Sequence, residues 1–161
     1  MTTAANGCVP CGMEQADDAA IVFRDDLWAC EVIPGFDVPG WFVLRVRRHA
    51  LRIGGLTDRE LATYGRRARD LIGAVGEVTG APATYLLTFG EANPHFHSLV
   101  AARGADVPPD RRMAGILNQR DDRLDRAAAL ALVPRVAAAY TRLASAGQSL
   151  HGSASPAHVG H

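Results

Sequence analysis

Short apolar runs separated by turn residues characterise the first third of the chain. Asp25-Asp26 divides two of these runs, and a loop bounded by Pro34-Gly35 and Pro39-Gly40 precedes the third. The links are too short for parallel crossovers, so antiparallel pairing is expected. The pattern predicts strands at 21–24, 27–32 and 41–46.

The clearest helix in the sequence lies between Thr57 and Gly80. Thr57 and Glu60 have the spacing of a capping box, in which each side chain bonds the other residue's backbone N–H. Apolar residues then recur every three or four positions, as one buried face of a helix requires, and most charged residues fall outside that stripe. Gly80 is expected to end the helix.

The second half of the chain contains two further strand patterns and then helical ones. The strands are expected at 84–89 and 95–102, and the helical stretches at 111–120 and 125–145, with Pro134 splitting or kinking the last. Strands interrupted by one long helix and followed by more helix indicate an α+β fold. The expected architecture is a five-stranded, mostly antiparallel sheet with one long helix and C-terminal helices.

Length and composition indicate one domain. The chain has 161 residues, of which 48% are hydrophobic, which is enough for a single core. The domain is expected to span 1–146, because 147–161 is rich in Gly, Ser, Ala and His without apolar periodicity. That tail is expected to be mobile.

Charge and hydropathy narrow the classes of partner. The 17 basic residues balance the 17 acidic ones, so no overall field attracts nucleic acid or an anionic membrane. The longest apolar runs, such as 127–132, fall short of the roughly 20 residues that span a bilayer, and the N-terminus lacks a signal-peptide pattern. We therefore expect a cytoplasmic protein that binds a small molecule and contacts neither nucleic acid nor membrane.

Cys8 and Cys11 form a Cys-x-x-Cys pair, which lets two thiolates reach one metal ion from a tight turn. A tetrahedral zinc site needs two more ligands, and His49 and His95 both lie at the ends of predicted strands, where they can converge. Redox chemistry is an alternative, although the pair precedes every regular element instead of opening a helix. An incidental pair is the other alternative, and Cys30 in the second strand is expected to be a small buried residue.

The sequence His95-Phe96-His97 begins the fifth predicted strand. Alternate residues of a strand share a face, so His95, His97 and Leu99 are expected to point the same way, about 7 Å apart in succession. A neutral imidazole is a good nucleophile toward phosphorus near neutral pH, which makes His97 a candidate catalytic residue. The alternative is a pair of polar strand residues hydrogen-bonded to the backbone.

Taken together, Cys8-x-x-Cys11, Arg48-His49 and Asn93-Pro-His-Phe-His97 resemble motifs of the histidine-triad superfamily, which includes nucleotide hydrolases and transferases. The resemblance covers about residues 8–103. It implies a five-stranded antiparallel sheet with a long helix, a mononucleotide site along the histidine strand, and often a homodimer. These implications agree with the strand count from the apolar pattern.

The resemblance also implies roles for individual residues. In zinc-bearing members the metal is held by two cysteines, a histidine after the third strand and the first histidine of the triad. Those positions correspond to Cys8, Cys11, His49 and His95, and the ion is expected to be structural Zn²⁺. The middle histidine of the triad, which becomes nucleotidylated, corresponds to His97.

This sequence departs from the family pattern at two places. Leu99 stands where the third histidine is expected, and it offers neither a proton nor a hydrogen bond. The Gly-rich stretch that usually precedes the triad is replaced by a shorter connection. Asn93, Ser98 and Arg103 are the polar residues nearest the histidines and are, with Leu99, the candidate substrate-binding residues.

The function predicted is a hydrolase or nucleotidyl transferase that acts on a phosphoanhydride or phosphoramidate through His97, of the dinucleoside polyphosphate hydrolase kind. Leu99 motivates two alternatives. One is a catalytically weak protein that binds a nucleotide or another small ligand. The other is a scaffold that performs a different reaction.

Overall fold

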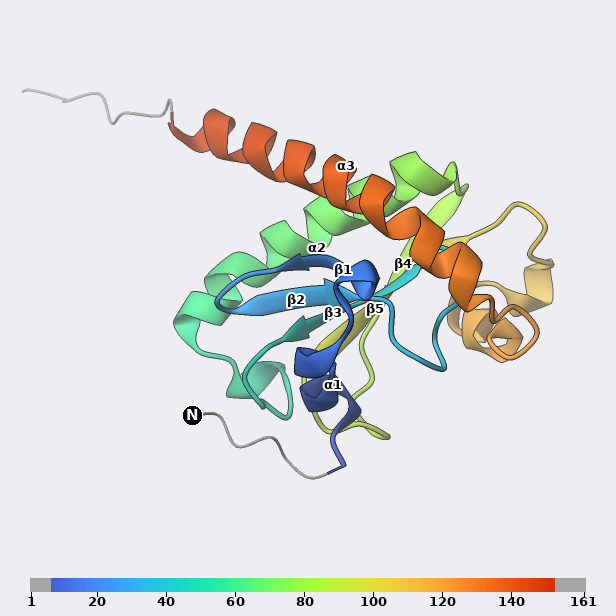
Figure 1. Cartoon of the computed structure of the whole chain (residues 1–161), viewed down its shortest axis with the longest axis horizontal. Coiled ribbons are helices and arrows are strands. Elements are labelled where there is room, and N and C mark those ends of the chain that lie inside the picture. Colours follow the sequence, from blue (N-terminus) through green and yellow to red (C-terminus); the bar gives the residue numbers. More distant parts are fainter. Residues whose placement is uncertain (1–6, 153–161) are drawn as a thin grey trace, which may run out of the picture.

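A computed structural model describes residues 7–152, with side chains for 7–147. Its centre is a five-stranded sheet in which every neighbouring pair is antiparallel, in the order β1-β2-β3-β5-β4 (Figure 1). The strands are β1 (Ile21–Arg24), β2 (Trp28–Glu31), β3 (Trp41–Val46), β4 (Ala83–Leu87) and β5 (His97–Arg103). The predicted α+β class and strand number are therefore confirmed, with ends that shift by one or two residues in β2, β4 and β5.

The pairing register places two sets of side chains on opposite faces of the sheet. Arg45 of β3 lies opposite His97 of β5, and Leu99 lies between Val43 of β3 and Leu87 of β4. Because side chains alternate along a strand, these residues share one face, which we call the histidine face. The other face is covered by helices.

The long helix α2 (Asp58–Thr79) has the predicted limits. Thr57 accepts a hydrogen bond from the Glu60 backbone N–H, and the Glu60 carboxylate accepts one from the Thr57 N–H, which completes the capping box. Gly80 follows with φ 62°, a left-handed conformation that ends the helix at little cost for glycine.

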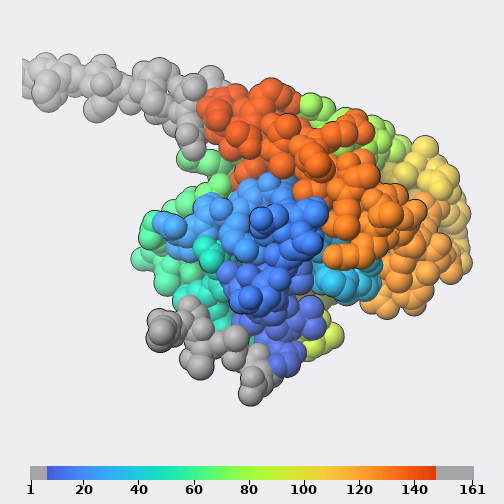
Figure 2. Space-filling view, in the orientation of Figure 1, coloured from blue at the N-terminus to red at the C-terminus, as the bar shows by residue number. Residues whose placement is uncertain are grey.

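The last helix, α3 (Arg126–Gly152), is longer than predicted and continuous across Pro134. Residues 147–152 continue this helix, so the predicted boundary at 146 falls within α3. The rest of the expected tail, 153–161, lies outside the described residues. Figure 2 shows α3 as the orange and red surface across the top of this view, above the blue N-terminal part of the chain.

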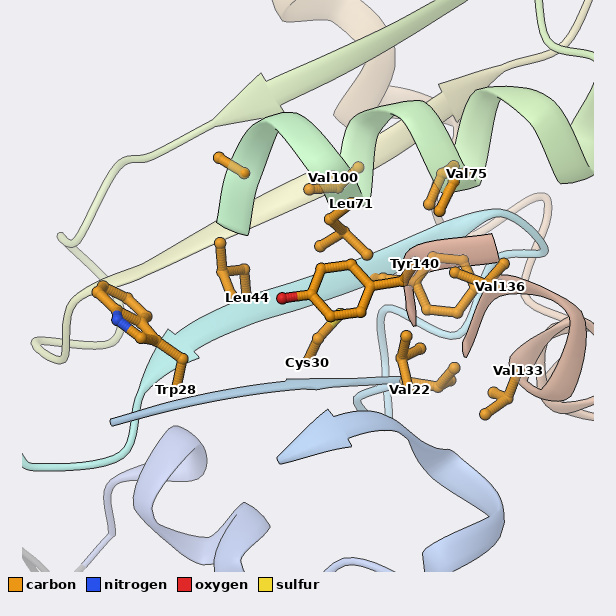
Figure 3. Close-up of a cluster of buried hydrophobic side chains, with 14 of the residues drawn as sticks. Val22, Trp28, Cys30, Leu44, Leu71, Val75, Val100, Val133, Val136 and Tyr140 are labelled. Atoms are coloured by element: carbon orange, nitrogen blue, oxygen red, sulfur yellow. The ribbon is translucent and has the colours of Figure 1, made fainter. Parts of the chain in front are cut away.

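Helices α2 and α3 form the main core with the sheet (Figure 3). Leu71 of α2 and Val136 of α3 are fully buried against sheet residues that include Cys30 and Leu44. The Tyr140 ring stacks on Phe23 at a centroid distance of 4.2 Å. Cys30 is thus the small buried residue that was expected, and burial raises the pKa of its thiol.

Residues Arg126–Gly147 of α3 are long and apolar enough to cross a membrane by length and composition. Ala129, Val133, Val136 and Tyr140 nevertheless recur at helical spacing and lie buried in the core. A single buried stripe is typical of a helix that packs on a core along one side. Packing within this fold accounts for that stripe, and 28% of the apolar window is buried.

Short helical segments connect the strands and the long helices, and residues of two of them pack on the histidine face. The N-terminal part was predicted to be a loop, but it contains α1 (Val9–Gly12) and the 3-10 helices η1 (Met13–Gln15) and η2 (Asp18–Ala20). Helix η3 (Ile53–Gly55) precedes α2, and η4 (Pro109–Arg111) and η5 (Met113–Gln119) occupy the predicted helical stretch 111–120. Met13 and Ile116 pack with Leu99 and Val43 in a second, smaller core.

Candidate functional site

Four side chains converge at one end of the histidine face. Cys8 immediately precedes α1 and Cys11 lies within it. His49 follows β3, and His95 lies two residues before β5 begins. Their four potential ligand atoms all lie within 4.8 Å of one another. The structure therefore brings together the four residues predicted to bind metal.

The distances within this cluster fit a tetrahedral ion. His95 Nδ1 lies 3.4 Å from Cys8 Sγ and 3.3 Å from Cys11 Sγ, and His49 Nδ1 lies 3.3 Å from Cys11 Sγ. Bonds of about 2.3 Å to sulfur and about 2.0 Å to nitrogen give ligand separations of about 3.5 Å in a tetrahedron. Two thiolates and two imidazoles are the donors that zinc prefers.

Both ring nitrogens of His95 have defined partners. Nε2 lies 2.6 Å from the Val46 carbonyl oxygen, which can only accept, so Nε2 carries the proton. Nδ1 therefore presents its lone pair to the cysteine sulfurs, as metal binding requires. Burial, the largest effect, lowers the pKa of His95 and favours this neutral form.

A network of buried charges lies beside the cysteines and was not foreseen from the sequence. Arg45 is fully buried and forms two hydrogen bonds to Glu31, with Nε to Oε2 at 2.9 Å and Nη2 to Oε1 at 2.8 Å. Its third nitrogen, Nη1, donates to Glu14 Oε1 at 2.8 Å. Glu14 also accepts from Arg47, so three residues after Cys11 the chain is fixed to β3.

His97 is held in one tautomer by the backbone. Its Nδ1 lies 2.6 Å from the His95 carbonyl oxygen and must therefore donate the proton of this hydrogen bond. In the neutral imidazole, Nε2 is then the nitrogen with a lone pair. The His-x-His spacing thus gives the two histidines different roles: one faces the metal cluster, and the other is oriented by the first residue's carbonyl group.

His97 borders an apolar cavity of about 370 Å³, which we call the histidine pocket. The row Val43, Leu99 and Leu87 contributes to its lining from the sheet, and Asn93 lies on the loop that precedes the histidines. Other lining residues come from α1, from the loop after β2 and from η5, and they include Val9, Pro10, Ile33, Phe36 and Leu117. A second cavity, of about 250 Å³, borders His97 and is lined by Arg52 and Tyr64 among others.

The structure brings only two of the four candidate substrate-binding residues to the histidine pocket, Asn93 and Leu99. Ser98 is fully buried on the opposite face, where its hydroxyl lies 2.7 Å from that of Tyr64 and 2.6 Å from that of Thr88. Arg103 lies six residues beyond His97 on β5, about 20 Å along the strand. The alternation of the strand and this distance place Ser98 and Arg103 outside the pocket.

Solved structures with the same fold include histidine-triad proteins. A hypothetical histidine triad nucleotide-binding protein from Sulfolobus tokodaii matches 84% of this chain and 93% of its own, with 14% identity and a TM-score of 0.64. A zinc-bound histidine triad family protein from Mycobacterium smegmatis matches 87% of this chain and 97% of its own, with 16% identity and a TM-score of 0.62.

A uridylyltransferase also shares the fold, with 16% identity and a TM-score of 0.58 over 84% of this chain and 45% of that one. No protein-family model and no curated protein matches the sequence. At identities this low the comparison establishes the fold, and the chain has the fold of histidine-triad proteins.

The charge network generates a prediction about pH. Hydrogen bonds from Arg47 are the main cause of a lowered pKa at Glu14, and the hydrogen bond and positive charge of Arg45 add to it. These effects outweigh partial burial, which raises the pKa, and bring it from 4.5 to about 2. A carboxyl with a lowered pKa stabilises the fold fully above its unfolded pKa, and that contribution is lost as pH falls toward 2. We expect Glu14→Gln to reduce the free energy of unfolding by about 1.5–3 kcal/mol at pH 7, in denaturant titrations.

The difference between wild type and Glu14→Gln should shrink between pH 4.5 and 2. Glu91→Gln, at an exposed position, serves as the matched control and should change stability by less than about 0.5 kcal/mol. A loss of stability in Glu14→Gln that stays constant across this pH range would contradict the ion-pair explanation.

Proposed function

We propose that the chain is a nucleotide-directed hydrolase or nucleotidyl transferase that cleaves a phosphoanhydride or phosphoramidate, with His97 as nucleophile. The observation that carries this proposal is the hydrogen bond from His97 Nδ1 to the His95 carbonyl, which leaves Nε2 with a lone pair at the pocket. The shared fold with a nucleotide-binding protein and a uridylyltransferase supports a nucleotide as the substrate class.

In the proposed reaction, His97 Nε2 attacks the phosphorus that is bonded to the nucleoside. A phosphorus–nitrogen bond forms, and the bond to the leaving group breaks with its electron pair on the leaving group. A phosphate leaves as the anion, and an amine takes a proton from solvent water as it leaves. The proton on Nδ1 stays hydrogen-bonded to the His95 carbonyl, which accommodates the positive charge that develops on the ring. Water then releases the nucleotide in a hydrolase, and an acceptor group does so in a transferase.

The cluster of Cys8, Cys11, His49 and His95 is proposed to hold a structural zinc ion. When bound, zinc would crosslink the N-terminal segment to the ends of β3 and β5 without an open coordination position for chemistry. The fold shared with a zinc-bound protein supports this choice of metal. A cytoplasmic location and a homodimer remain predictions from the sequence.

Leu99 favours a second candidate function, a nucleotide-binding protein with little or no turnover. Its side chain is buried in an apolar row, so the position next to His97 on the strand offers no proton for a leaving group. Such a protein would bind a nucleoside monophosphate reversibly. The experiment on His97 below distinguishes the two candidates.

The first prediction of this proposal concerns a covalent intermediate. Incubation with diadenosine polyphosphates or an adenosine phosphoramidate should add one adenylyl group to the protein, detected by intact mass spectrometry and mapped to His97. His97→Ala should abolish the adduct and lower turnover at least about 100-fold, because it removes the nucleophile. Arg103→Ala, which lies about 20 Å along β5 from His97, is the control and should react like wild type.

Turnover that persists in His97→Ala would contradict the proposed role of His97. Saturable binding of AMP without an adduct or turnover would instead support the nucleotide-binding candidate. These two results are distinct, since one retains chemistry without His97 and the other lacks chemistry altogether.

The second prediction concerns the metal. We expect about one zinc ion per chain by elemental analysis of the purified protein, and chelation should lower the thermal unfolding midpoint because metal binding is coupled to folding. Cys11→Ser should lose the zinc and the stabilisation together. Cys30→Ser serves as the control that retains zinc, since Cys30 lies in the main core. A metal-free protein with unchanged stability after chelation would contradict this role.

A further inference from the structure

The two residues between the metal-binding cysteines are also part of the histidine pocket. Val9 and Pro10 line the cavity that contains His97 and Leu99. Pro10 is buried, whereas the Val9 side chain is 48% exposed at the edge of the cavity. Val9 and Pro10, which lie between the two cysteines of the metal cluster, therefore form a wall of the pocket in which the ligand is expected.

The position of this wall depends on contacts made at its two ends. On the C-terminal side, Glu14 is fixed to Arg45 and Arg47, and Arg24 donates a hydrogen bond of 2.9 Å to the Met13 carbonyl. On the N-terminal side, Cys8 Sγ lies 3.4 Å from His95 Nδ1 in the metal cluster. The wall is thus attached to the sheet by charge on one side and by the metal cluster on the other.

Helix α1 is too short to be stable without contacts to the rest of the fold. It comprises the four residues Val9–Gly12, and its turn is closed by backbone hydrogen bonds from Gly12 N–H to the Cys8 carbonyl, at 3.0 Å, and from Met13 N–H to the Val9 carbonyl. A single turn is far below the length at which an isolated helix is stable in water. The geometry of Val9 and Pro10 therefore follows from where Cys8 and Cys11 are fixed.

A second connection joins the metal cluster to the pocket. His95 contributes Nδ1 to the cluster and its carbonyl oxygen to His97 Nδ1. Fixing the His95 ring therefore also fixes the group that orients the proposed nucleophile. Metal binding thus acts on two sides of the pocket, the α1 wall and the His97 imidazole.

We propose that Val9 and Pro10 contact the bound ligand and that zinc sets their position, so that zinc and the ligand bind cooperatively. The inference rests on the proposed function for the class of ligand, a nucleotide. Because the wall consists of an aliphatic side chain and a proline ring in the same cavity as the Leu99 row, it fits the apolar face of a base and not a phosphate group. The phosphate is then placed at the His97 end of the pocket.

Cooperativity of this kind must be reciprocal. If zinc increases the affinity for the nucleotide by some factor, the nucleotide increases the affinity for zinc by the same factor. Couplings between sites in proteins are commonly about 5-fold to 150-fold. Since the two sites share a segment of four residues, we expect a coupling of at least about 10-fold.

The test uses AMP as the probe and measures both directions on the full chain. Calorimetry gives the affinity for AMP of zinc-loaded and zinc-depleted protein, and competition with a chelator gives the affinity for zinc with and without saturating AMP. The competition starts from the folded, zinc-loaded protein, so it remains valid even if the zinc-depleted protein unfolds. We expect both affinities to change by the same factor, about 10-fold or more.

Val9→Gly tests the wall directly, because it keeps all four metal ligands while removing the apolar contact and loosening the turn. The coupling should fall to about 2-fold or less, and zinc should still bind. Gln15→Gly is the matched control in the same segment, at an exposed position outside the chelating turn, and it should keep the wild-type coupling.

Three results would overturn the inference, and they differ in what else they affect. AMP affinity that is independent of zinc overturns the coupling and leaves the proposed function intact. Coupling that is equal in wild type, Val9→Gly and Gln15→Gly shows that zinc acts only through overall folding. Zinc-loaded protein that neither binds AMP nor forms an adduct overturns this inference and the proposed function together.

Discussion

The site depends on how His95 is held. Its Nε2 donates to the Val46 carbonyl of β3, its Nδ1 faces the two cysteine sulfurs, and its own carbonyl accepts the proton of His97 Nδ1. Each contact constrains the next, since a ring that donates through Nε2 must present a lone pair at Nδ1. One residue therefore connects the sheet, the metal cluster and the proposed nucleophile.

A buried network of charged side chains around Arg45 supports this arrangement, and burying those charges costs free energy. Arg45, the cross-strand partner of His97, is fully buried and gives its hydrogen bonds to Glu31 and Glu14. Buried charges are expensive to remove from water, and their mutual attraction repays this only when every donor has a partner. The network attaches the N-terminal segment to the sheet beside the metal cluster, and this attachment closes one side of the histidine pocket.

Much of this arrangement follows from local patterns in the sequence. Alternating apolar residues and the Thr57–Glu60 capping box predicted the sheet and α2, and the Cys-x-x-Cys pair with His49 and His95 predicted the cluster that the structure assembles. Strand alternation also contained the information that Ser98 faces away from His97. Counting residues along β5 likewise places Arg103 too far away to reach it.

Features that depend on distant pairings were not predictable in the same way. Arg45 in an otherwise apolar strand was a signal for a buried ion pair, but the sequence alone does not identify Glu14 and Glu31 as its partners. The contribution of Val9 and Pro10 to the pocket depends on how α1 lies across the sheet, which no local pattern specifies. The sequence likewise predicted a helical stretch at 111–120 and did not distinguish the 3-10 geometry of η5 from that of an α-helix.

The central claim is that His95 and His97 are fixed in complementary tautomers, and nitrogen-15 NMR of the zinc-loaded protein tests it most directly. We expect His97 to carry its proton on Nδ1 with an unprotonated Nε2, and His95 to carry its proton on Nε2 with Nδ1 bound to the metal. A His97 protonated on Nε2, or a His95 that binds the metal through Nε2, would contradict the account.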